Sequence, residues 1–228
     1  MFDSVWLSVL SFEALLFTIA IAFILLAMTK ERTELRHKTA ALVDPLTGIA
    51  NRRAFLEDAA ALAKHQGNVA RPSVVLLADL DHFKSINDRF GHAVGDRVLQ
   101  VFAGSASGAL GPLDLIGRLG GEEFAIVLNG AGRENGLALA ERIRTSFLEA
   151  AGDVDGRPVG GTVSIGMAIS DGEVFDLAGL LAQADEALYC AKERGRNRVE
   201  VASLELIMQR TREALAQEPR VAAAPSAA

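Results

Sequence analysis

The sequence of 228 residues has a single cysteine, Cys190, and a net charge of −6. One cysteine excludes an internal disulfide, and because Cys190 lies in an apolar helical stretch we expect it to pack in a core. Proteins that bind nucleic acid gather Lys and Arg to neutralise phosphates, so the acidic balance argues against a nucleic-acid partner. The chain is long enough for one ordinary core and a small appendage.

No Lys or Arg precedes the long apolar run over residues 5–28, whose only charged residue is Glu13. A cleaved signal peptide would carry positive charge before such a run and a small-residue cleavage site after it. As a helix the run would rise about 36 Å, enough to cross a hydrocarbon core of about 30 Å. We therefore predict an uncleaved transmembrane helix ahead of the rest of the chain.

Basic residues follow this run at Lys30, Arg32, Arg36 and Lys38. Positive charge marks the cytoplasmic side, so we expect a single-pass protein of the inner (cytoplasmic) membrane with its C-terminal part in the cytoplasm. A carboxylate such as Glu13 is costly inside a span. Three explanations are open: protonation, pairing across a helix dimer, or hydration near the outer interface. The last two are favoured equally.

The segment 29–43 contains no Gly or Pro and is rich in helix formers. Leu35 and Leu42 are seven residues apart, but one heptad is too little to establish a coiled coil. A helix that carries a signal and a plain solvated linker are equally favoured. No sensory domain is recognisable before this linker, so the input, for example an unidentified membrane signalling partner, is open.

Two neighbouring glycines, Gly120 and Gly121, precede two carboxylates, Glu122 and Glu123, and an apolar run. Adjacent glycines favour a tight turn and the apolar run favours a buried strand. We expect a hairpin with acidic side chains at its tip. Taken alone, this motif also fits a solvated turn.

A second acidic group follows segment 74–78, which is typical of a central strand buried on both faces. Asp79 and Asp81 alternate with Leu80 and would share one face of an extended chain. Adjacent carboxylates repel each other unless a cation lies between them. Opposite an acidic hairpin, they predict a site for a hard divalent cation such as Mg²⁺, which takes oxygen ligands.

Four segments in order resemble the GGDEF-domain family: 44–53 (DPLTGIANRR), 79–96 (DLDHFKSINDRFGHAVGD), 120–124 (GGEEF) and 191–197 (AKERGRN). The resemblance covers residues 40 to 202, and four motifs in register make it specific. Members of this family are diguanylate cyclases, which condense two GTP molecules into cyclic di-GMP. The resemblance implies an α/β fold with a palm-like mixed sheet flanked by helices, similar to nucleotide cyclases.

The resemblance implies that Asp79 and Glu122 are metal carboxylates and that the Leu80 carbonyl is a further ligand. Two Mg²⁺ ions per active site, or Mn²⁺ in their place, would activate the attacking 3′-hydroxyl and stabilise the leaving oxygens. Glu123 is a candidate for metal binding or for assisting deprotonation, and the sequence leaves both roles open.

The substrate GTP needs donors for its phosphates and partners for its base. By resemblance six side chains bind it: Lys84, Lys192 and Arg196 at the phosphates, and Asn87, Asp96 and His92 at the guanine end. Asn87 can donate and accept while Asp96 only accepts, which suits the N1 and N2 hydrogens of guanine. Lys192 and Arg196 alone would equally fit a solvated helix end.

One departure from the family pattern concerns an inhibitory Arg-x-x-Asp site that many members carry. Asp114 stands in the Asp position, but Gly111 stands where the Arg would be. Glycine cannot make the bidentate contacts of an arginine. We expect this chain to lack a complete inhibitory site.

The pattern along the chain predicts helices at 52–65, 83–90, 95–107, 134–150 and 177–194, and strands at 74–78, 113–119, 124–129, 162–170 and 199–202. A hairpin interrupts the alternation of strands and helices, so a mixed sheet is expected. The expected parts are a membrane anchor (1–30), a helical linker (31–43), a catalytic domain (44–203), and a short helix with a disordered tail (204–228).

These observations predict a Mg-dependent diguanylate cyclase that acts as a homodimer at the membrane. One domain offers one set of metal and phosphate ligands, yet the product joins two nucleotides. The alternatives are a catalytically weak domain that serves as a GTP-binding receptor, and a membrane-tethered interaction module.

Overall fold

The computed structural model describes residues 6, 10, 12–18, 20–26, 42–66, 71–170 and 175–203. The chain divides into two compact units, Met1–Val43 and Asp44–Ala228. The predicted anchor falls partly, and the predicted linker almost wholly, outside the described residues. The predicted terminal helix and tail, 204–228, also lie outside them.

In the first unit, residues 12–18 and 20–26 are helical and their large apolar side chains are exposed. The Thr18 hydroxyl donates to the carbonyl of Ala14 at 2.7 Å, a common way to satisfy a hydroxyl on an apolar helix. Over the part of the chain that the structure describes, no helix is both long enough and apolar enough to cross a membrane.

The second unit contains the following elements in chain order: β1 (Ala50–Asn51), α2 (Arg52–Gln66), β2 (Ser73–Leu80), α3 (Phe83–Phe90), α4 (His92–Ala109), β3 (Leu115–Gly120), β4 (Glu123–Asn129), α5 (Arg133–Ala150), β5 (Val163–Ser170), α6 (Leu177–Glu193) and β6 (Val199–Val201). The described strands form one six-stranded sheet in the order β1-β3-β4-β2-β5-β6. The four central strands pair antiparallel, and β1–β3 and β5–β6 pair parallel. The predicted mixed sheet is confirmed.

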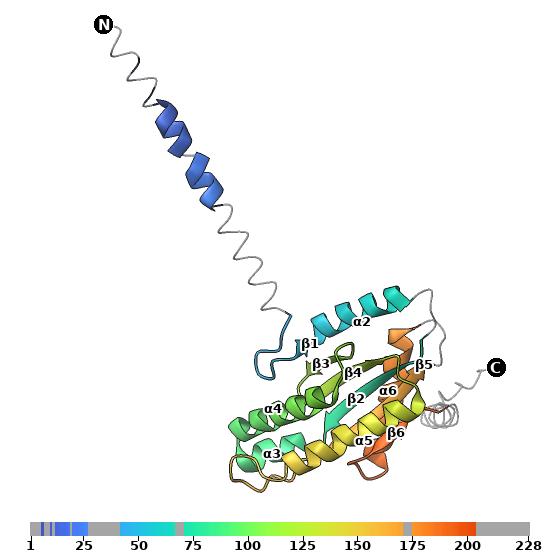
Figure 1. The fold of residues 1–228 in the computed structure, drawn as a ribbon. Helices are drawn as coiled ribbons and strands as arrows, with labels where there is room; N and C mark the ends of the chain where they lie inside the picture. The colour runs from blue at the N-terminus through green and yellow to red at the C-terminus, as the bar shows by residue number, and fades with distance from the viewer. Residues whose placement is uncertain are drawn as a thin grey trace, which may run out of the picture. The chain divides into compact units, whose positions relative to one another are not determined.

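Helices cover both faces of this sheet (Figure 1). The even-numbered residues of β2, from Val74 to Leu80, belong to a core shared with α3, α4 and α5. Val75 belongs to a second core, shared with α2 and α6. Because successive strand residues point to opposite faces, Asp79 lies on the side of α2 and α6.

The helix α6 lies against β5 without side chains between them at Gly166. A Cβ added at Gly166 would lie 2.0 Å from the carbonyl oxygen of Ala184 and 2.3 Å from the backbone nitrogen of Leu188. No residue with a side chain fits this approach without displacing the helix. The glycine thereby allows the last turn of α6, which carries Lys192, to lie near the end of β2.

The sequence predicted these helices and most strands to within a few residues at each end. The strand β1 was not predicted, because two residues are too few to show a periodicity. β1 matters for the site, since its pairing with β3 holds the start of the domain beside the hairpin.

Candidate active site

The acidic end of β2 and the tip of the β3–β4 hairpin are joined by backbone contacts. Asp79 lies opposite Glu123 in the antiparallel β2–β4 pair, and the N–H of Leu80 donates to the carbonyl of Glu122 at 3.3 Å. Residues directly opposite in such a pair point to the same face. The structure therefore brings together the residues predicted for metal binding and deprotonation: Asp79, Leu80, Glu122 and Glu123.

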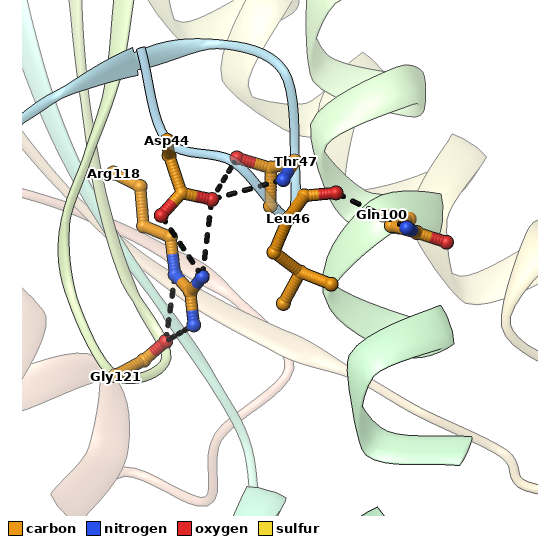
Figure 2. A network of polar contacts seen from close by, with 6 residues as sticks. All are labelled: Asp44, Leu46, Thr47, Gln100, Arg118 and Gly121. Atoms are coloured by element: carbon orange, nitrogen blue, oxygen red, sulfur yellow. Dashed lines mark hydrogen bonds and ion pairs between the residues drawn. The ribbon is translucent and has the colours of Figure 1, made fainter. Parts of the chain in front are cut away.

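The hairpin tip depends on a glycine and on Arg118. Gly121 has φ of +50°, a region that side-chain-bearing residues rarely adopt. Arg118 donates from Nε and Nη2 to the carbonyl oxygen of Gly121 at 3.0 and 2.6 Å (Figure 2). The guanidinium thus closes the turn from which Glu122 projects.

Asp44, at the start of the second unit, holds the opposite side of Arg118. The Arg118 Nη1 lies 3.1 and 3.2 Å from the two carboxylate oxygens of Asp44. Thr47 donates to Asp44 from its N–H and hydroxyl, and Gln100 donates to the carbonyl of Leu46 (Figure 2). Burial acts to raise the pKa of Asp44, but the hydrogen bonds from Thr47 and Arg118 outweigh it and lower this pKa. The network ties the first residues of the domain to the hairpin.

Lys192 is the cation nearest to the acidic cluster. Its Nζ lies 2.9 Å from Oδ2 of Asp79. Burial raises the pKa of Asp79 despite the opposing effect of Lys192. Burial, followed by the charge of Asp79, raises the pKa of Glu122. Two carboxyls that resist ionisation beside each other favour a further cation between them.

Among the described residues, no three His, Cys, Asp or Glu side chains form a group able to hold a metal ion by themselves. Mg²⁺ takes only one or two carboxylates and fills its other positions with backbone oxygens, water and phosphate. Asp79, Glu122 and the Leu80 carbonyl supply that donor set. Their position beside one another and the raised pKa values of the two carboxyls therefore fit a Mg²⁺ site.

Asp81 has different surroundings from Asp79. It is 4% exposed, and its carboxylate accepts hydrogen bonds from the hydroxyls of Thr162 and Ser164, both at 2.7 Å, and from the N–H of Asn197 at 3.0 Å. The sequence pattern predicted that Asp79 and Asp81 would share a cation. In the structure, neutral donors surround Asp81 instead.

The predicted guanine ligands gather where α3 meets α4. A Cβ at Gly95 would lie 1.9 Å from Oδ1 of Asn87, so the Asn87 side chain packs on the backbone beside Asp96. The N–H of Gly91, between the helices, donates to the carbonyl of Asn87 at 2.9 Å. Asp96 and His92 are exposed on the first turns of α4. These residues form a group of their own, on elements separate from the acidic cluster.

Two predicted phosphate ligands, Lys84 and Arg196, are exposed. Lys84 lies in the first turn of α3, and Arg196 in the loop after α6. After burial and Lys192, the charge of Asp81 raises the pKa of Asp79 and the charge of Arg196 lowers it. Lys192 and Arg196 therefore belong to the acidic cluster, whereas Lys84 belongs to the neighbouring helix.

Asp114, at the position of the family's inhibitory aspartate, accepts hydrogen bonds from neighbouring backbone groups. Its carboxylate accepts from the N–H of Gly111 at 2.8 Å and from the N–H of Asn129 at 3.1 Å. A cavity of about 460 Å³ lies beside it and includes Arg142 in its wall. Both carboxylate oxygens of Asp114 thus stabilise the loop that leads into β3.

Several residues around the site were not predicted as part of it. Arg118 could have been found, because it stands two residues before the first of the two glycines. The donors to Asp81 could not, since Thr162, Ser164 and Asn197 lie 81, 83 and 116 residues away along the chain. No local pattern connects positions so far apart.

Comparison with known protein families gives a match over residues 41–198, to the model described as diguanylate cyclase, GGDEF domain. The chain is 40% identical over 162 residues to the diguanylate cyclase DgcP of Pseudomonas aeruginosa. These residues are 71% of this chain but 24% of DgcP. The chain thus spans about a quarter of that relative.

Solved structures give the same match. The coiled coil and GGDEF domain of DgcB from Caulobacter crescentus, in complex with c-di-GMP, is 28% identical with a TM-score of 0.70, over 81% of this chain and 97% of that chain. The active GGEEF domain of a diguanylate cyclase from Vibrio cholerae is 34% identical with a TM-score of 0.63, over 68% of this chain and 98% of that chain.

Proposed function

The chain belongs to the GGDEF family of diguanylate cyclases, and from this premise we propose that its second unit condenses two GTP molecules into cyclic di-GMP with release of two pyrophosphates. The observation that carries this proposal is the junction of β2 with the hairpin. There Asp79 and Glu122 lie beside each other, and Lys192 contacts Asp79 at 2.9 Å. Carboxylates for a cation and an ammonium for phosphate are what a nucleotidyl transfer needs.

GTP binds with its triphosphate at the end of α6 and its base between α3 and α4. Lys192 and Arg196 bind the β- and γ-phosphates, and Lys84 approaches from α3. Asn87 and Asp96 read the guanine, with His92 beside them. The contact of Asn87 with the backbone at Gly95 supports this assignment, because it fixes the amide next to Asp96.

The Leu80 carbonyl and the carboxylates of Asp79 and Glu122 would hold Mg²⁺, two ions per site, with Mn²⁺ as a substitute. When bound, the cations lower the pKa of the attacking hydroxyl and stabilise the leaving oxygens. The raised pKa values of Asp79 and Glu122 support this role, since both groups gain from a nearby positive charge.

In the reaction, the 3′-hydroxyl oxygen of each GTP forms a bond to the α-phosphorus of the other. The bond from that phosphorus to the pyrophosphate oxygen breaks. The hydroxyl proton passes to a carboxylate, and Glu123, exposed and opposite Asp79, is the candidate acceptor. Because each domain has one set of ligands, two domains face each other as a homodimer, each presenting one GTP.

The first unit tethers this activity to the inner membrane, with the catalytic domain in the cytoplasm where GTP is available. The uninterrupted apolar character of residues 5–28 and the basic residues that follow support this placement. The exposed apolar side chains of residues 12–18 and 20–26 are suited to lipid or to a second copy of the helix. A membrane signalling partner would act through this unit.

Product inhibition through an Arg-x-x-Asp site is absent or weak in this chain. Gly111 replaces the arginine, and Asp114 is occupied by the N–H groups of Gly111 and Asn129. An anionic product would meet a carboxylate there without the compensating guanidinium.

The proposed function is tested by incubating the purified chain with GTP and Mg²⁺ and separating the nucleotides. Cyclic di-GMP and pyrophosphate in a 1:2 ratio are expected. Binding of GTP without product would favour the receptor alternative, and neither binding nor product would favour an interaction module. Activity per chain that falls on dilution would support the homodimer.

A further inference from the structure

Asp81 is a buried carboxylate that the proposed reaction leaves without a role. Its three hydrogen-bond donors are two hydroxyls, on Thr162 and Ser164, and the backbone N–H of Asn197. In addition, the Asp81 N–H donates to the carbonyl of Thr162 at 2.8 Å. A carboxylate accepts at both oxygens, so it can take all three donors at once. Asp81 therefore joins the end of β2 to the loop after α6.

Three successive residues of that loop have unfavourable backbone dihedral angles. Gly195, Arg196 and Asn197 have φ of +110°, +62° and +45° in succession. Positive φ is easy for glycine but costs free energy for residues with side chains, so a run of it persists only where the surroundings fix it. Arg196 lies in the middle of this run.

Arg196, Asn197 and Arg198 each form a separate hydrogen bond to a neighbouring element. The Arg196 N–H donates to the carbonyl of Ala191 at 2.9 Å, which closes the end of α6. The next N–H, of Asn197, donates to Asp81 at 3.0 Å. The carbonyl of Arg198 accepts from Ile165 at 2.9 Å, where β6 begins. Two of these three hydrogen bonds join backbone groups, and only the bond from Asn197 to Asp81 has a charged side chain as its acceptor.

The side chain of Asn197 contributes a second restraint. Its Oδ1 accepts from Nη1 of Arg144, on α5, at 2.9 Å. Asn197 is thereby held from both sides, by its backbone at Asp81 and by its side chain at Arg144. The direction in which Arg196 leaves the loop follows from these two contacts.

We propose that Asp81 is a positioning residue that fixes the loop at residues 195–197, so that Arg196 projects toward the phosphates of the nucleotide. This rests on the proposed function for the role of Arg196. Asp81 would not ligate the cation, which separates its role from that of Asp79. Its effect is on binding of the β- and γ-phosphates and reaches the substrate only through Arg196.

The test compares nucleotides that differ in those phosphates. The parent chain and Asp81→Asn are titrated with GMP and with a GTP analogue whose α,β-bridging oxygen is a methylene, so that no pyrophosphate can leave. The amide keeps one acceptor oxygen and places an N–H₂ at the other position, so the cluster loses an acceptor and the charge that strengthens its hydrogen bonds. We expect binding of the analogue to weaken about tenfold, with GMP affinity changed by less than about twofold.

A double-mutant cycle tests whether Asp81 affects nucleotide binding through Arg196. In an Arg196→Ala background, Asp81→Asn should weaken binding of the analogue by less than about twofold, because the side chain it positions is gone. An unchanged tenfold loss in that background would overturn the proposal. Equal losses for GMP and the analogue would overturn it too, since they indicate general damage to the domain.

Thr162→Val is the matched control, because it removes one donor and leaves the carboxylate and its bond to Asn197. It should retain most of the affinity for the analogue. If Asp81→Asn does not fold, amide hydrogen exchange at Asn197 in Arg144→Ala, which removes the restraint on the Asn197 side chain, gives the second measurement. Faster exchange with selective loss of analogue binding supports the proposal, and unchanged binding with faster exchange contradicts it.

Titration with Mg²⁺ alone separates positioning from ligation. Asp79→Asn should weaken binding of the ion strongly, and Asp81→Asn should leave it within about twofold of the parent. A loss of Mg²⁺ binding in Asp81→Asn as large as in Asp79→Asn would make Asp81 a ligand and overturn the proposal. Failure of the proposed function would appear in the parent chain itself, as absence of product, whereas failure of this inference appears only in the variants.

Discussion

Asp79 and Asp81 are two carboxylates at the end of the same strand, both nearly buried, at 7% and 4% exposure, yet their surroundings differ in kind. Asp79 faces the ammonium of Lys192 and the carboxyl group of Glu122. Asp81 faces two hydroxyls and a backbone N–H. One carboxylate is left with a charge to be neutralised, while the other has its hydrogen-bonding capacity used by the fold.

The difference between the two surroundings gives Asp79 and Asp81 opposite effects on the stability of the folded domain. Burial raises the pKa of Asp79, so the folded domain favours its protonated form. Ionised Asp79 therefore opposes folding at neutral pH, as expected of a group arranged for a substrate. Asp81 accepts hydrogen bonds that link β2 to the start of β5 and to the loop after α6, and it thereby stabilises the fold. Residue type alone did not decide between these roles.

The largest effect on turnover should come from removing a carboxylate from the acidic cluster that contains Asp79. Glu122→Gln should lower turnover about a thousandfold or more, because a neutral amide holds Mg²⁺ poorly and cation stabilisation of the transition state is lost. The measurement is the rate of cyclic di-GMP formation, with circular dichroism to show that the domain is folded. Near-normal turnover in this variant would remove Glu122 from the site.

The next effect concerns the approach of α6 that brings Lys192 to Asp79. Gly166→Ala should destabilise the domain by about 2–3 kcal/mol, because the added Cβ meets the backbone of α6 and the helix has to move. The matched control is Gly104→Ala in α4, where a Cβ meets nothing within 4 Å. That change should stabilise by about 0.5–1 kcal/mol. Denaturant unfolding measures both, and a Gly166→Ala variant as stable as the parent would contradict the close approach.

Much of this architecture follows from the sequence, and the comparison shows where sequence reasoning stops. The continuous apolar run at 74–78 predicted β2 as a strand buried on both faces, and the GGEEF segment predicted the hairpin. The pattern Asp79-Leu80-Asp81 predicted only that both carboxylates would share one face, because alternation reports which face a side chain lies on and nothing about the donors it meets. Those donors come from β5 and from the loop after α6, so only the fold reveals them.

A smaller effect is expected on the pH dependence of cation binding. The pKa values of Asp79 and Glu122 are raised above 3.8 and 4.5, so protons compete with the cation at a higher pH than for ordinary carboxyls. Affinity for Mg²⁺ should therefore fall as pH falls through the raised values, and should recover above them. Titration calorimetry at several pH values measures this. A cation affinity that stays flat until pH falls below 3.8 would contradict the raised pKa of Asp79.

The central claim, that Asp79 serves the substrate at the expense of the fold while Asp81 serves the fold, is tested most directly by the stability of the metal-free domain. A raised pKa means that the contribution of Asp79 to stability is fully present below pH 3.8 and is lost as pH rises through the raised value. At neutral pH, Asp79→Asn should therefore unfold at the same or a higher denaturant concentration than the parent. Asp81→Asn should lose about 1–3 kcal/mol, because weaker neutral hydrogen bonds replace the charge-assisted ones of a buried carboxylate. Equal losses in the two variants, or the reverse order, would contradict the account.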